Sequence, residues 1–283
     1  MQILFDFKTP KPEKEAKQYQ IRQTIRRATI KWLLDMEPQA RPAIGIDVPT
    51  RGNMFKADIA AAWFQCRRIK TPNGRFTMVQ EPSRTTLVIC SASRQDCWPE
   101  CADAERLLTE IATLKQELRD VEQRIRDNEP ELRDHNMLFD EFAVWNYTAT
   151  KDKNYHKLVK QISHLENTLF RGSRLAKLGG SMTANEIYLA VPKNTITPDE
   201  VITSWGLLEI DMKTLEVFEI KKAEPMSAIP ELQHHLAMVI AECNTRQLAD
   251  CHGLRINDNA PTTVLKMPTF HRATSSPNGQ KKH

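Results

Sequence analysis

Three short segments in the C-terminal half, taken in their order along the chain, constrain the fold most. Residues 186–192 form the compact apolar run Glu-Ile-Tyr-Leu-Ala-Val-Pro, which predicts a strand that ends at its proline. Residues 205–211 and 217–223 predict two further strands, and the polar turn between them predicts that they pair as a hairpin. Residues 197–200, Thr-Pro-Asp-Glu, offer an N-cap, a first-turn proline and acids, so a helix is expected to begin between the first two strands.

The N-terminal part predicts a helix followed by more strands. From Pro12 to Met36 apolar residues recur at steps of three and four, which is typical of an amphipathic helix. Residues 43–49 and 56–64 predict two strands that pair across the turn at 50–53, and residues 85–90, rich in β-branched side chains, predict a central strand. Residues 75–79 predict another short strand or an extended loop. Near the C-terminus, residues 230–251 predict a helix, and residues 257–283 are expected to be disordered.

Between these parts the pattern changes to that of long helices. A first apolar seam, with alternating steps of four and three residues, consists of Leu107, Ile111, Leu114, Leu118, Val121 and Ile125. A second seam consists of Leu158, Ile162, Leu165 and Leu169. Residues 132–147 predict a third helix and a turn. The simplest arrangement is an antiparallel coiled-coil hairpin, residues 102–180, inserted into an α/β domain made of residues 1–101 and 181–256. This hairpin is expected to act as a spacer, or to bind a protein partner or a second copy through residues 107–125 and 158–169.

Composition agrees with a globular protein outside the membrane. Hydrophobic residues make up 40% and charged residues 27%, and no run approaches the roughly twenty apolar residues of a membrane span. The first residues do not look like a secretory signal, so a cytoplasmic location is expected. The six cysteines are expected to be free thiols. A metal site built from Cys97 and Cys101 with Cys90, Cys243, Cys251 and His252 matches no established spacing.

The order of the strands, with the Tyr-Leu-Ala-Val-Pro and Trp-Gly-Leu-Leu segments, resembles the distal half of small PD-(D/E)XK nuclease-like domains. The similarity is to the MmcB-like group associated with DNA repair, and it covers residues about 40–98 and 185–225, or roughly half the chain. It implies a restriction-endonuclease-like mixed sheet flanked by helices, and a role in binding or processing nucleic acid. The net charge of +4 is compatible with contacts to phosphates but does not require them.

The resemblance also implies where an active site belongs. A PD-(D/E)XK nuclease has an acid on one strand and a Glu-x-Lys pair on the next, and its two acids hold a divalent metal, generally Mg²⁺. Asp58 matches the first acid, and Ser93-Arg-Gln-Asp96 matches the run that follows the pair. Counting back places the glutamate slot at Ile89 and the lysine slot at Ser91, and shifting the frame by one gives Val88 and Cys90. The second acid and the lysine are therefore missing, and Asp58 alone would hold a metal weakly unless Glu15, Glu81 or Asp96 supplied oxygens.

The favoured interpretation is a degenerate nuclease that has no cofactor and binds nucleic acid, with DNA preferred, or a partner protein. Its expected phosphate contacts are Arg22, Arg26, Lys31, Arg51, Lys56 and Arg94, and a further basic cluster lies at Arg67, Arg68 and Lys70. One alternative is an active Mg²⁺-dependent endonuclease that uses the literal Glu219-Ile-Lys221 motif with Asp211, although that motif falls in the terminal hairpin. The other alternative is an assembly protein that works through its helical arm.

Overall fold

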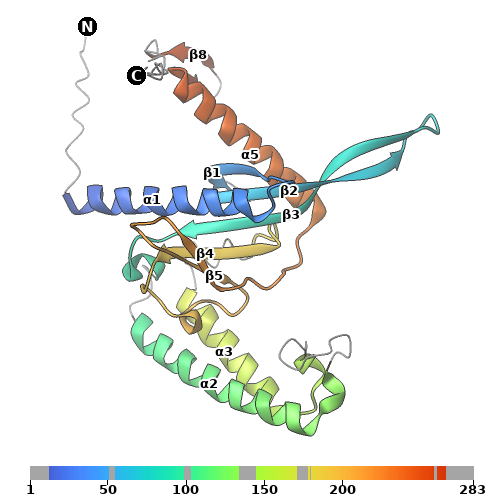
Figure 1. Ribbon diagram of the computed structural model, residues 1–283, viewed down its shortest axis with the longest axis vertical. Coiled ribbons are helices and arrows are strands. Elements are labelled where there is room, and N and C mark those ends of the chain that lie inside the picture. The colour runs from blue at the N-terminus through green and yellow to red at the C-terminus, as the bar shows by residue number, and fades with distance from the viewer. Residues whose placement is uncertain are drawn as a thin grey trace, which may run out of the picture.

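A six-stranded mixed sheet forms the centre of the molecule (Figure 1). The computed structural model describes residues 13–50, 55–98, 103–133, 145–170, 178, 180–257 and 260–265. The strands lie in the order of the chain: β1 (Ala43–Pro49), β2 (Lys56–Lys70), β3 (Phe76–Cys90), β4 (Glu186–Pro192), β5 (Gly206–Ile210) and β6 (Val217–Lys221). Strands β3, β4 and β5 are parallel, and the other neighbouring pairs are antiparallel. The expected mixed sheet is therefore present.

Helices cover both faces of this sheet. Helix α1 (Glu13–Met36) crosses one face, where Ile25 and Leu33 pack against Ile59, Val88 and Tyr188. Helix α5 (Pro230–Cys251) covers the other face together with the bases of α2 (Ala104–Asn128) and α3 (Lys153–Phe170). Because successive strand residues point to opposite faces, a strand covered on both sides needs a continuous apolar run. The segments at 57–63, 85–90 and 187–191 have this composition and are buried.

Helices α2 and α3 run side by side in opposite directions as a helical hairpin (Figure 1). At its base, Leu107, Ile111 and Phe170 belong to the same apolar cluster as Ile89 and Leu207 of the sheet. A separate cluster at the far end contains Val121, Ile125 and Leu158. The hairpin is thus part of the sheet's core at one end and an independent arm at the other. A third helix was expected at residues 132–147. Short 3₁₀ turns occur at the two ends of this segment, at Pro130–Leu132 and Tyr147–Ala149, and residues 134–144 lie outside the described part.

Two segments differ from the sequence expectation. The segments predicted at 56–64, 75–79 and 85–90 are two strands of 15 residues each, β2 and β3, which form one long hairpin. At the C-terminal end, β7 (Leu254–Asn257) and β8 (Ala260–Val264) pair as a small hairpin where disorder was expected. Residues 266–283 of that expected tail lie outside the described residues.

The expected helix start at Thr197 is a single 3₁₀ turn, Pro198–Glu200, with a capping box between Thr197 and Glu200. Among the described helices, none combines the length and the apolar character that crossing a membrane requires.

Candidate functional site

Asp58 lies beside the end of β3, and both oxygens of its carboxylate accept hydrogen bonds. Oδ2 accepts a hydrogen bond from the backbone N–H of Cys90 at 3.0 Å, and Oδ1 accepts one from Nη2 of Arg26 on α1 at 2.6 Å. The Asp58 side chain is only 2% exposed. Arg26 also pairs with Asp47 of β1, so one guanidinium bridges two carboxylates between helix and sheet.

The Arg26 guanidinium balances the negative charges of Asp58 and Asp47. Burial by itself acts to lower the pKa of Arg26, but the hydrogen bonds that it donates to Asp58 and Asp47, together with their negative charges, outweigh burial and raise the pKa, so the group stays charged. The two expected slots beside Asp58 contribute nothing to bind a cation: Ile89 is in the apolar core, and Ser91 is buried and donates its N–H to the Ala190 carbonyl.

The donor set therefore does not fit Mg²⁺, which binds hard oxygen ligands. Within the described ranges, no cluster of three or more His, Cys, Asp or Glu side chains has a metal-binding arrangement. Of the conceivable extra donors, Glu81 lies on the β2–β3 hairpin and pairs with Arg67, and Asp96 lies in the 3₁₀ turn Arg94–Cys97. The side chain of Glu15 is outside the described part.

The alternative Glu219-x-Lys221 motif is divided between the two faces of the sheet. Its strand, β6, lies at the edge opposite β1, three strands away from β3. A bulge places Lys221 opposite Leu207 but Glu219 opposite Leu208, and these two leucines belong to the clusters on opposite faces. Glu219 accepts a hydrogen bond from the Tyr188 hydroxyl at 2.7 Å, while Asp211 accepts bonds from the N–H groups of its own turn. The motif does not bring an acid and a lysine to one site.

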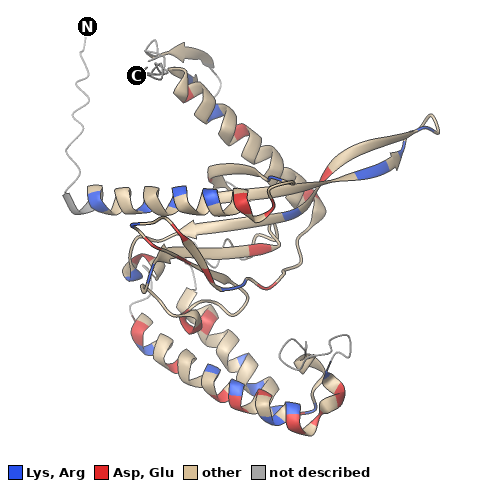
Figure 2. Cartoon of the chain, viewed as in Figure 1, with Lys and Arg blue, Asp and Glu red and all other residues tan. Residues whose placement is uncertain are grey.

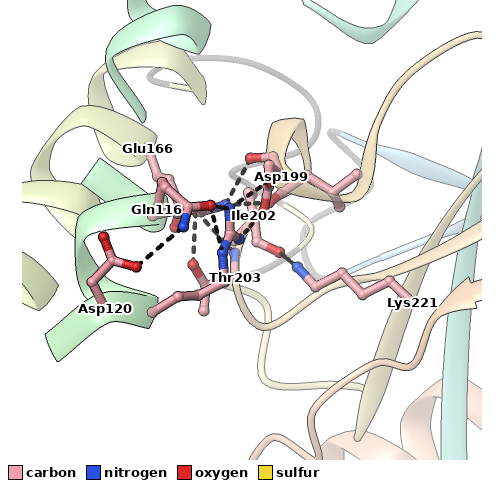
Figure 3. Close-up of polar contacts among 10 residues, drawn as sticks. Gln116, Asp120, Glu166, Asp199, Ile202, Thr203 and Lys221 are labelled. Atoms are coloured by element: carbon pink, nitrogen blue, oxygen red, sulfur yellow. Dashed lines mark hydrogen bonds and ion pairs between the residues drawn. The ribbon is translucent and has the colours of Figure 1, made fainter. Parts of the chain in front are cut away.

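Lys221 instead belongs to a polar cluster that fixes the helical hairpin to the sheet (Figure 3). Its Nζ donates to the Ile202 carbonyl at 2.9 Å, and burial, with the nearby Lys115 charge, lowers the pKa of Lys221 to about 8. Lys115 of α2 pairs with Glu166 of α3 at 2.9 Å and donates to the carbonyls of Asp199 and Val201. Glu166 also accepts hydrogen bonds from Thr203.

Three of the six basic residues expected to contact phosphates are held by carboxylates. Arg26 is buried as described, Lys31 pairs with Asp35 one turn away, and Arg94 pairs with Glu105 and Glu200. Arg22 is half-buried on α1, Lys56 lines a groove between β1 and α5, and Arg51 lies outside the described residues.

A different basic surface lies on the outer part of the β2–β3 hairpin, residues 64–84, which we call the β-arm. It projects away from the sheet and its helices (Figure 1), and Figure 2 shows positive residues toward its outer end. It contains five cationic residues, Arg67, Arg68, Lys70, Arg75 and Arg84, and one acid, Glu81. The resulting net charge of +4 equals that of the whole chain.

The β-arm also carries large apolar side chains in solvent. Phe76 is 58% and Met78 is 60% exposed, and the Arg68 guanidinium lies over the Phe76 ring at 4.1 Å. The tip closes through the Thr71 N–H, which donates to the Arg75 carbonyl at 2.7 Å, and Gly74 has a φ of 77°, a conformation that favours glycine. Arg67, Arg68 and Lys70 stand out in the sequence as a basic cluster, whereas Arg75, Phe76 and Met78 were not predicted to belong to a site. The Pro-Asn-Gly turn between two basic segments was the available signal.

Disulfides are absent among the cysteines that the structure describes. Cys90 and Cys97 are buried in the clusters on opposite faces of the sheet, and burial raises the pKa of Cys97 to about 11. Cys101 lies outside the described residues.

No protein-family model matches the chain, and no curated protein matches it. A solved structure of a protein of unknown function from Silicibacter pomeroyi is similar over 81% of this chain and 88% of that chain, with 14% identity and a TM-score of 0.38. A likeness at this level carries no argument about function.

Proposed function

We propose that this protein is a nucleic-acid-binding member of the PD-(D/E)XK nuclease-like group that has lost its metal site, and that the β-arm is its binding element. The inserted helical hairpin is then a coiled-coil addition to a restriction-endonuclease-like sheet. The strand order, and the position of Asp58 beside the end of β3, support this reading. The Arg26–Asp58 ion pair supports the loss of catalysis, because a guanidinium is bound where a metal would be needed.

The observation that carries the binding function is the concentration of positive charge on a projecting β-hairpin. Phosphates attract lysine and arginine without regard to sequence, and this term dominates the affinity of most nucleic-acid-binding surfaces. Arg68, Lys70 and Arg75 of the arm are exposed, whereas Arg26 and Arg94 are held in ion pairs against the body of the protein.

A titration of labelled DNA at several salt concentrations tests the proposal. The triple variant Arg68→Ala, Lys70→Ala and Arg75→Ala removes three exposed cations outside the core. We expect weaker binding, and a slope of log K against log salt that is smaller by up to about 3 than in the unmodified protein. The control, Lys153→Ala, Lys157→Ala and Lys160→Ala, removes the same charge from the exposed side of α3. An equal loss of DNA affinity in both variants would show that binding depends on the net charge of the protein and not on the β-arm.

Incubation of plasmid with the protein and Mg²⁺ or Mn²⁺ tests the loss of catalysis. We expect no metal-dependent cleavage, because Asp58 is held by Arg26 and neither Ile89 nor Ser91 supplies a carboxylate. Cleavage that Asp58→Ala abolishes would contradict the loss of catalysis at Asp58. Cleavage that Glu219→Ala abolishes would show that the active site lies on β6.

A second candidate function, docking of a protein partner, is favoured by a groove of about 730 Å³ along α2 and α3. Leu114 and Leu165 contribute apolar surface to it, and Lys153, Lys157 and Lys160 line it with positive charge. This combination suits an acidic amphipathic helix of a partner. Lys157→Glu with Lys160→Glu should abolish capture of such a partner and leave DNA binding unchanged; retained capture would rule the groove out.

A further inference from the structure

The two faces of the β-arm differ in chemistry. Residues directly opposite each other on paired strands share a face, so Arg68 with Met78 and Lys70 with Phe76 lie on one face. The stacking of Arg68 on Phe76 agrees with this assignment. The opposite face contains Arg67 with Val79, Ile69 with Thr77, and Gln65 with Glu81.

Only the first face presents cations without an acid. On the opposite face Arg67 is paired with Glu81 at 3.3 Å, which offsets its charge. On the first face Arg68 and Lys70 lie beside Phe76 and Met78, the two most exposed large apolar side chains of the arm. A ligand of this face must offer both negative charge and apolar surface. Nucleic acid offers both, as phosphates and as bases.

The shape of the arm decides which form of nucleic acid fits. Paired strands lie about 4.8 Å apart, so a two-stranded ribbon with its side chains is roughly 10 Å across. The major groove of B-form DNA is about 12 Å wide and admits such a ribbon, whereas the minor groove is only about 6 Å wide. The major groove of double-helical RNA is deep and narrow and excludes it. A single strand is bound best by successive stacked aromatic rings. Phe64 and Phe76, the phenylalanines of the arm, lie near its opposite ends.

We propose that the β-arm lies in the major groove of duplex DNA, with the Arg68–Met78 and Lys70–Phe76 face toward the base edges. This inference rests on the proposed function and names its substrate. Arg68 and Lys70 then reach base edges or phosphates, and Phe76 and Met78 make apolar contacts with thymine methyl groups at the floor of the groove. The opposite face, with the Arg67–Glu81 pair, stays in solvent.

Fluorescence anisotropy on the full chain tests the proposal with probes of matched length: duplex DNA, duplex RNA, single-stranded DNA, and a duplex in which uracil replaces thymine. We expect duplex DNA to bind tightest, and the uracil duplex to bind about fourfold more weakly for each contacted methyl group that is lost. Methyl green, which occupies the major groove, should displace the protein, and netropsin, which occupies the minor groove, should not.

A pair of variants separates the two faces of the arm. Phe76→Ser with Met78→Ser keeps every charge, so it should retain the salt dependence while losing the difference between thymine and uracil duplexes. Ile69→Ser, on the opposite face and also exposed, should behave like the unmodified protein.

The possible failures are distinguishable. Tighter binding of single strands or duplex RNA, displacement by netropsin, or equal affinity for the thymine and uracil duplexes overturns the groove assignment while the proposed function stands. Absence of binding to any nucleic acid, including the case in which the arm binds only anionic lipid vesicles, overturns both.

Discussion

Replacing Arg26 with methionine tests whether a guanidinium has taken over the place of a metal beside Asp58. Methionine keeps the length and apolar stem of the side chain but removes its charge. Arg26 and Asp58 are 11% and 2% exposed, and their closest atoms are 2.6 Å apart. Removing one partner of such a buried pair costs about 3–5 kcal/mol, because the other charge stays buried without its counter-ion. We expect Arg26→Met to lower the free energy of unfolding by an amount in this range.

Companion variants make this prediction specific. In Asp58→Asn, Arg26 keeps Asp47 as a partner, so the expected loss is smaller, about 1–3 kcal/mol. The double variant should be more stable than Arg26→Met alone, because it no longer buries an isolated carboxylate. Lys31→Met, on the same helix, breaks the exposed Lys31–Asp35 pair and should change stability by less than about 1 kcal/mol.

Urea unfolding followed by circular dichroism, with and without Mg²⁺, measures these differences. The reasoning is refuted if Arg26→Met lowers the free energy of unfolding as little as Lys31→Met does. It is also refuted if the loss in the double variant equals the sum of the losses in the two single variants. Stabilisation of Arg26→Met by Mg²⁺ would refute a different step, since it would show that Asp58 and its neighbours form a metal site once the guanidinium is gone.

Two further predictions concern the cluster at the base of the hairpin. The pKa of Lys221 is about 8 in the folded protein, against a usual value of 10.5. Between pH 8 and 10.5 the unfolded chain therefore binds more protons than the folded protein. The free energy of unfolding should rise with pH across this range, by up to about 3 kcal/mol. Lys221→Met should remove most of this rise in urea titrations from pH 7 to about 10.5; an unchanged pH profile would contradict the burial of the ammonium group. Lys115→Met leaves Glu166 buried without its ion partner, so it should lower the free energy of unfolding by about 3 kcal/mol and speed hydrogen exchange in α2 and α3. The control, Arg119→Met, breaks an exposed pair with Asp199 and should lower the free energy of unfolding by less than about 1 kcal/mol.

The secondary structure near the sheet was largely predictable because local patterns and burial agree there. The expected helices at 12–36 and 230–251 match α1 and α5, and the strand at 186–192 matches β4. The β2–β3 hairpin was not predicted at full length, since its outer half has no buried face and so no apolar alternation to detect. The β7–β8 hairpin was missed for the same reason, as its described side chains are exposed or half-buried.

By itself, the sequence determined which segments form the long helices and most strands of the central sheet, that residues 87–90 are apolar, and that basic residues flank a Pro-Asn-Gly turn. These properties are local, because each depends on residue type and on spacing along the chain. Only the tertiary structure decided which side chains contact one another. Arg26 is 32 residues from Asp58, and the packing of α1 on the sheet brings them together. A bulge of one residue separates Glu219 from Lys221, which a strict alternation along the strand would have placed on one face.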